Sequence, residues 1–213
     1  MPFTHDQFLD VFGSYNRAVW PAAAGLWLVT LGTHVQLYRR HPKASPTLAF
    51  LLALHWTWAG AVYHLAFFLP INPAAALFGV GFLLQAALFV WRAARRGGLT
   101  FTPTPSIWSR LGLLLILYAL IYPVLGLLAG LEYPRLPTFG VPCPTTILTA
   151  GVLLLAPRRE ARILGVIPVL WAGVGGSGAF LLGIPADLML PVAGLLLVLY
   201  VFLPAGDRTR VTA

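Results

Sequence analysis

The chain has 213 residues, of which 59% are hydrophobic and only 9% are charged, against about 25% charged residues in ordinary soluble domains. A water-soluble protein of this length could not bury so much apolar surface, so composition predicts an all-α protein whose main solvent is lipid. The formal net charge of +8 does not indicate nucleic-acid binding, because the basic residues stand between apolar runs and form no aromatic-laced patch. A single cysteine excludes an intramolecular disulfide.

The first residues, 1–16, are predicted to form a short amphipathic helix at the outer face of the membrane. Thr4 and Gln7 have the spacing of a capping box, and Phe3 and Phe8 occupy the positions of a hydrophobic staple. Apolar side chains recur at helical spacing along the segment: Phe8, Val11, Phe12 and Tyr15. Such a helix either lies in the lipid interface or packs on the remaining helices, and the residues alone do not decide between the two.

Seven apolar segments follow, each long enough to cross about 30 Å of hydrocarbon, which takes about 20 helical residues. We expect helices because backbone polar groups in lipid must pair within their own segment. The predicted spans are 18–38, 46–69, 73–92, 107–130, 139–157, 162–182 and 184–204. An odd number of spans puts the two ends of the chain on opposite sides of the membrane.

The basic residues predict the orientation of these spans. All but Arg17 and Arg135 fall after the first, third, fifth and seventh spans: Arg39, Arg40, Lys43, Arg92, Arg95, Arg96, Arg110, Arg158, Arg159, Arg162, Arg208 and Arg210. The positive-inside rule places that side in the cytoplasm. The N-terminus is then outside and the tail, 205–213, is cytoplasmic. We predict a multi-pass protein of the bacterial inner (plasma) membrane.

Two stretches of the chain, 58–91 and 171–204, resemble each other. Both begin with Trp-Ala-Gly, and further identical pairs follow at the same offset: Phe67/Phe180, Ile71/Ile184 and Gly81/Gly194. This predicts a parallel pseudo-repeat of three helices, 17–106 and 131–204, joined by a linker helix, 107–130. Parallel repeats of this kind build one class of secondary transporter, with the substrate site between the halves.

The three-plus-one-plus-three plan is similar in layout to the SWEET and PQ-loop transporters, although the chain has no Pro-Gln dipeptide. In sequence, "YHLAFFLPINPAA" from Tyr63 and "PTFGVPCPTT" from Pro137 resemble an uncharacterised bacterial family of multi-span membrane proteins, which carries only a domain-of-unknown-function label. This resemblance covers most of the chain and implies no activity.

Polar side chains at membrane depth are costly and therefore mark functional candidates. They gather toward the outer ends of the predicted spans: Tyr63, His64, Asn72, Tyr122, Cys143, Ser177 and Asp187. At 1.5 Å per residue, His64 and Cys143 lie about 6–8 Å below the outer ends of their spans. In the repeat, His64 aligns with Ser177. Pro142 and Pro144 are expected to disturb the first turns of the fifth span, so that Cys143 borders the resulting gap.

These residues predict binding and translocation of a small solute or ion through an outward-facing polar pocket, with membrane lipid as the other partner. The alternative is a membrane enzyme or a metal- or haem-dependent redox protein, since His64 and Cys143 together suit copper(I) or zinc, although their spacing matches no metal motif. A third class is a structural subunit of a membrane complex. The cofactor is unknown, and a homo-oligomer is among the states that the sequence allows.

A haem held within one helix is disfavoured. His55 and His64 are nine positions apart, which places them on opposite faces of an α-helix. A pair of His55 with His34 stays open, but His34 stands near the basic interface, where we expect it to extend toward the membrane surface. Cys143, His64 and Asp187 have the residue types of a nucleophile, a base and an orienting group, but nothing in their spacing indicates that they meet.

Overall fold

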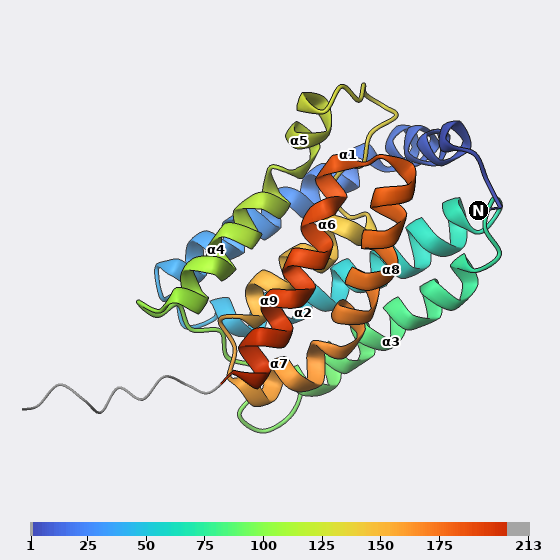
Figure 1. Cartoon of the computed structure of the whole chain (residues 1–213). Coiled ribbons are helices and arrows are strands. Elements are labelled where there is room, and N and C mark those ends of the chain that lie inside the picture. Colours follow the sequence, from blue (N-terminus) through green and yellow to red (C-terminus); the bar gives the residue numbers. More distant parts are fainter. Residues whose placement is uncertain (1, 204–213) are drawn as a thin grey trace, which may run out of the picture.

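The computed structural model describes residues 2–203, and every regular element in that range is a helix (Figure 1). Four of the described helical segments are long and apolar enough to cross a membrane, or six if each of two bent helix pairs is one crossing. These apolar helices indicate a membrane protein. The predicted tail, 205–213, lies outside the described residues.

The chain begins with a long helix, α1, His5–Tyr38. Its start follows the sequence prediction. The Thr4 hydroxyl accepts a hydrogen bond from the Gln7 backbone N–H, and the Gln7 side chain accepts one from the Thr4 N–H, which completes the capping box. The rings of Phe3 and Phe8 stack with centroids 5.8 Å apart, as the hydrophobic staple requires.

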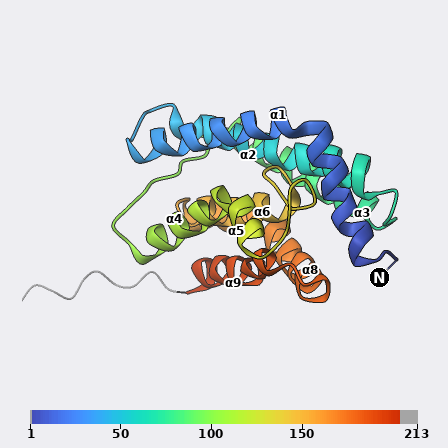
Figure 2. The ribbon, with the colours of Figure 1, turned by 90° about the horizontal axis from the view of Figure 1, so that it is seen from above.

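The segment 1–16 and the first span, 18–38, were predicted as two helices, but α1 joins them without a break. Pro21 lies inside α1. Figure 2 shows that the helix changes direction between its N-terminal part and the rest. A proline within a helix removes one backbone hydrogen bond and crowds the preceding turn, so the helix bends. Contacts with the surrounding helices can keep such a bent helix continuous.

A helical hairpin follows. α2, Ala44–Trp58, continues directly into a π-helix, η1, Ala59–Phe68, and α3, Ala75–Ala93, returns beside them. Gly60 and Gly79 let the two arms approach closely, because a Cβ added at Gly60 would lie 3.0 Å from the Gly79 carbonyl oxygen. A π-helix of this length is unusual, since such turns occur mostly singly and often at functional sites.

The centre of the molecule is α6, Pro142–Leu153, which is buried along its whole length except at Cys143. It packs on α4, Ile107–Leu120, which bends by 64° into α5, Tyr122–Leu128. Twelve residues extend about 18 Å, less than the hydrocarbon thickness. The segment predicted as the fifth span, 139–157, is therefore not among the candidate crossings.

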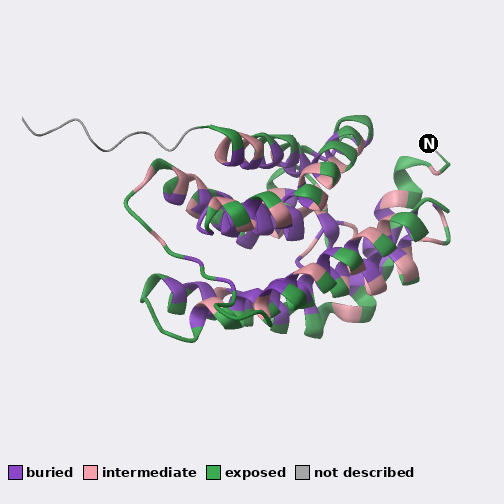
Figure 3. Cartoon of the chain, turned by 90° about the horizontal axis from the view of Figure 1, so that it is seen from below, coloured by how far each residue is buried: buried purple, intermediate pink, exposed green. Residues whose placement is uncertain are grey.

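The last elements form a second hairpin. α7, Arg158–Leu164, bends by 53° into α8, Val166–Leu182, and a short 3₁₀ turn, η2, Pro185–Leu188, leads into α9, Met189–Phe202. Figure 2 shows α4 and α6 between a layer with α1 and α2 and a layer with α8 and α9. In Figure 3 the buried residues gather where these layers face one another.

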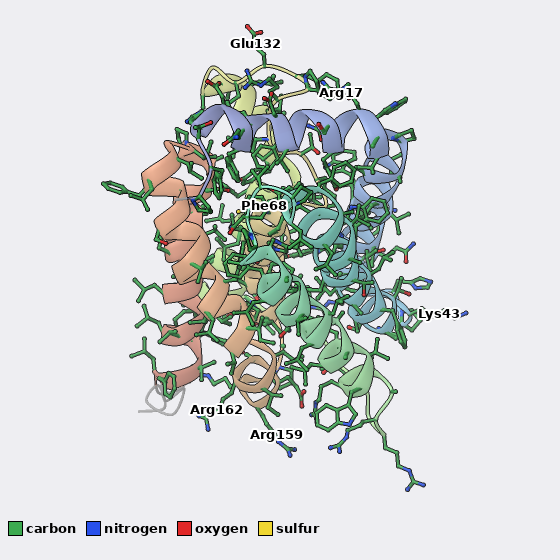
Figure 4. All side chains as sticks on the ribbon, turned by 90° about the vertical axis from the view of Figure 1, so that its right-hand side faces the viewer. Arg17, Lys43, Phe68, Glu132, Arg159 and Arg162 are labelled. Atoms are coloured by element: carbon green, nitrogen blue, oxygen red, sulfur yellow. The ribbon has the colours of Figure 1, made fainter. Side chains whose placement is uncertain are left out.

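Labelled charged residues in Figure 4 lie at both ends of the molecule, along the direction of the helices. In Figure 4, Arg159 and Arg162 lie at one end of the molecule, whereas Arg17 and Glu132 lie at the other. We call the end that holds Arg159 and Arg162 the basic end.

Candidate functional site

A cavity of about 260 Å³ lies at the end opposite the basic end. Its walls come from the first turns of α1, from η1, from the start of α6, and from α8 and η2. Most of the lining is aromatic or aliphatic, with a few polar side chains among it. This composition is typical of sites for small molecules, and the volume is close to the lower bound of about 300 Å³ for such sites. We call it the aromatic cavity.

Six of the seven predicted contact residues line the aromatic cavity: Tyr63, His64, Asn72, Cys143, Ser177 and Asp187. The seventh, Tyr122, lies behind the wall and donates a hydrogen bond to Asp187. Four separate segments of the chain thus bring their polar groups to one place. His64 and Ser177, which the repeat aligns, both face this cavity.

His64 is fully buried, and neither of its ring nitrogens has a hydrogen-bond partner. Its ring instead makes T-shaped contacts with the rings of Phe82 and Trp171, at centroid distances of 4.8 and 5.0 Å. A buried polar group without a partner destabilises a fold by about 1–3 kcal/mol. An imidazole kept in this state on the wall of a cavity is placed to bond something that enters the cavity.

Trp171 is a second group of this kind, and it is not among the contact residues predicted from the sequence. Its Nε1 is buried and makes no hydrogen bond of ordinary geometry, with the Cys143 thiol, a weak acceptor, as a neighbouring group, and its ring meets that of Phe78 at 5.3 Å. Trp58, at the same repeat position, donates from Nε1 to the Tyr15 hydroxyl at 2.7 Å. The paired Trp-Ala-Gly starts were the one signal that could have drawn attention to Trp171.

Asp187 brings a carboxyl group into the cavity wall with 3% of its surface exposed. η2 positions it, since the Asp187 N–H donates to the Ile184 carbonyl at 3.0 Å. The Tyr122 hydroxyl donates to Oδ1. Within residues 2–203, no Lys, Arg or His nitrogen lies within 4.0 Å of this carboxyl group.

The N-terminal turns of α1 cover one side of the cavity. Phe3 and Phe8 meet Phe68 at centroid distances of 5.4 and 5.9 Å, and Phe12 stacks on Tyr63 at 5.8 Å. Figure 4 labels Phe68 beneath α1. Two arrangements were left open for the N-terminal helix. The structure shows the one in which the apolar face of this helix packs on the other helices.

The start of α6 differs from the prediction. Pro142 is the first residue of α6, where its missing N–H would have no partner within the helix, so the proline starts the helix instead of disturbing it. Gly140 precedes it with φ of +88°, and a Cβ there would lie 2.9 Å from the Tyr15 hydroxyl. Cys143 does border a cavity, as predicted, but one that several helices form together.

Only two residues, His64 and Cys143, were considered as metal ligands. His64 and Cys143 line the same cavity, but the described part of the chain contains no group of three or more His, Cys, Asp or Glu side chains that could hold a metal ion. Their predicted role as metal ligands stays a prediction.

The other two histidines considered for haem lie elsewhere, in a packed contact between α1 and α2. Thr30 joins them, because its hydroxyl is 2.8 Å from His55 Nε2 and its carbonyl is 2.8 Å from His34 Nδ1. All three residues are buried, so the prediction that His34 extends toward the membrane surface is wrong. Neither histidine lines the aromatic cavity.

Comparisons with curated proteins and with solved structures find no match to the chain. One family model does match, over residues 5–212, and its description is family of unknown function (DUF6064). The match covers nearly the whole chain and agrees with the resemblance drawn from "YHLAFFLPINPAA" and "PTFGVPCPTT". The chain therefore belongs to this family of unknown function, DUF6064.

Proposed function

We propose that this protein binds a small solute in the aromatic cavity and carries it across a membrane. The observation that supports binding most strongly is the pair of buried, unpartnered side chains, His64 and Trp171, on the wall of one cavity. Natural folds seldom leave buried polar groups without partners, and functional sites are among the exceptions. A solute with matching donors and acceptors would satisfy both groups.

The proposed topology keeps seven crossings, with the cavity open to the outside and the basic end in the cytoplasm. α4 with α5 and α7 with α8 each serve as one bent crossing, and α6, which is too short to cross on its own, completes the seventh together with the non-helical residues at its ends. Its ends are non-helical, which lipid does not tolerate, but Val141 and Leu154 to Ala156 are buried within protein. The separation of charges between the two ends supports this orientation.

The parallel three-plus-one-plus-three repeat remains part of the proposal. It is supported by the cavity walls, since the aligned residues His64 and Ser177 contribute to them from different halves. The likeness in layout to SWEET and PQ-loop transporters, the bacterial inner membrane as location, and the enzyme and structural-subunit alternatives all stay predictions.

Translocation requires the cavity to open toward the basic end, where packed side chains close it. Trp56 and Phe82 fill that side, with ring centroids 4.4 Å apart. Two elements that border the cavity are the parts we expect to move: the π-helix η1, and the glycine-rich "GVGGSG" stretch of the α-helix α8. Glycines and π-turns are common causes of bends in helices.

The binding step can be tested by filling the cavity from α8. Gly178 lines it, and a Cβ added there meets nothing within 4 Å. Gly173 is the matched control, because it lies on the same helix with equally open space but is exposed and away from the lining. The two variants are Gly178→Leu and Gly173→Leu.

The assay screens a panel of small solutes for a rise in Tm of the protein in lipid nanodiscs. We expect solutes that stabilise the wild type and Gly173→Leu but not Gly178→Leu, and we expect proteoliposomes with the first two proteins to take up the same solutes. Binding without uptake would contradict translocation. Equal stabilisation of Gly178→Leu would contradict the site.

A further inference from the structure

The charge balance of the aromatic cavity is unusual. Among the described residues that line it, Asp187 carries the only carboxyl group and there is no Lys or Arg. Buried carboxylates are normally paired with a cation or bonded by several donors. Asp187 accepts a hydrogen bond from the neutral Tyr122 hydroxyl and has no cationic side chain within 4.0 Å among the described residues. Without a counter-ion, burial favours the neutral form of this carboxyl group, and a positively charged ligand would supply the partner that favours the carboxylate.

The rest of the wall suits a cation that carries carbon. Five phenylalanines, Tyr63 and Trp171 line the cavity. The face of an aromatic ring attracts a cation within about 6 Å of its centroid, and the attraction reaches about 2 kcal/mol where water is excluded. Cages of such rings are a common means of binding alkylated ammonium groups.

An inorganic cation fits the same wall poorly. Calcium takes 6–8 oxygen ligands, and magnesium retains several water molecules in an octahedral shell. The polar lining supplies few oxygen atoms, from Asp187, Asn72, Ser177 and Tyr63, and the remaining surface is aromatic or aliphatic. A space of about 260 Å³ has room for an ammonium group with a short carbon chain.

From these observations we propose that the solute is a small organic cation with an alkylated ammonium group. Asp187 is its counter-ion, and the rings around Trp171 surround its carbon-bound charge. The inference rests on the proposed function and names the substrate class of the same cavity. The neutral His64 ring, and the Ser177 hydroxyl oxygen as an acceptor since its proton is donated to the Val174 carbonyl, are left to bond polar groups elsewhere in the solute.

The test compares two probes of nearly equal shape, choline and its neutral isostere 3,3-dimethylbutan-1-ol, by calorimetric titration of the protein in nanodiscs. The variants are Asp187→Asn and, as a matched control, Glu132→Gln, which removes an exposed carboxylate at the same end of the molecule. We expect wild type and Glu132→Gln to bind choline at least tenfold more tightly than the isostere. Asp187→Asn should remove that preference.

Equal affinity for the two probes in the wild type would overturn the cationic substrate class and leave a small-solute site intact. If the wild type bound neither probe, the cationic substrate class would also be overturned. The proposed function itself would then be decided by the wider panel of small solutes. Displacement of choline by millimolar Mg²⁺ would overturn it in favour of an inorganic cation. If Asp187→Asn fails to fold, Trp171→Leu replaces it, and choline affinity should then fall more than that of the isostere.

Discussion

The two ends of this molecule treat their buried polar groups in opposite ways. Toward the basic end most of these groups are paired: Arg92 Nε donates to Glu160 at 2.7 Å, and Gln85 Nε2 donates to the Leu164 carbonyl at 2.9 Å, although Gln85 Oε1 has no partner. At the other end, His64 and Trp171 have no partners and face a hollow. Pairing at the basic end holds α3 against the second hairpin. The unpaired groups contribute no comparable hydrogen bond to the fold, and we attribute this difference to the ligand that we propose they bind.

The largest effect is expected at the paired end. Arg92 and Glu160 form a two-pronged ion pair, with only 10% and 12% of their side chains exposed. Glu160→Gln leaves the Arg92 charge without its partner and should lower the free energy of unfolding by about 3 kcal/mol. Unfolding in mixed micelles measures it, and solute affinity of the folded protein should not change.

The double variant Arg92→Leu/Glu160→Leu is the control for this prediction. Removing both charges avoids the unpaired cation, so much of the lost stability should return. If Glu160→Gln unfolded like the wild type, the ion pair would not stabilise the basic end. The proposed difference between the two ends would then be contradicted.

A smaller effect should separate two histidines of α2 and η1. His55 loses its hydrogen bond with Thr30 in His55→Leu, so that variant should unfold about 1 kcal/mol more easily while still binding solute. His64 has no such bond to lose. His64→Leu should therefore keep or raise stability and lose solute binding. The two readouts are Tm and binding in nanodiscs, and the reverse pattern would assign His64 to the packed core.

The smallest effect should separate the two tryptophans that begin the repeated stretches. Trp58→Phe removes the hydrogen bond to the Tyr15 hydroxyl and should lower stability by about 0.5–1 kcal/mol. Trp171→Phe removes only a weak contact of Nε1 with the Cys143 thiol and should lower the free energy of unfolding less than Trp58→Phe does. Equal losses measured by unfolding in micelles would argue that Trp171 stabilises the fold as Trp58 does.

These contrasts also show what could be predicted from the sequence. Local signals were sufficient for the capping box of Thr4 and for the staple of Phe3 and Phe8. Depth within the predicted spans selected six residues that line one cavity. Depth works because polar groups are costly in lipid wherever the chain places them, whatever the packing.

Packing decided the features that the sequence did not predict. A hydropathy window counts apolar residues, so it could not separate α6, which is enclosed by protein, from a helix that faces lipid. The π-helix η1 packs on α3, and no residue preference in its sequence distinguishes it from an α-helix. In the sequence, Trp171 cannot be told apart from a tryptophan of the packed core. The structure distinguishes it from Trp58, because Trp58 Nε1 donates an ordinary hydrogen bond and Trp171 Nε1 does not.

The most direct test of the central claim, a solute site that opens on the side opposite the basic end, uses Cys143, which lines the aromatic cavity and is the only cysteine of the chain. A small, cationic, membrane-impermeant thiol reagent, a trimethylammonium methanethiosulfonate, is added to sealed vesicles of known sidedness. The account predicts modification of Cys143 from the outer side, and much slower modification in Gly178→Leu, with denatured protein reacting fully in both. Modification from the cytoplasmic side alone, or at equal rates in the two proteins, would contradict it.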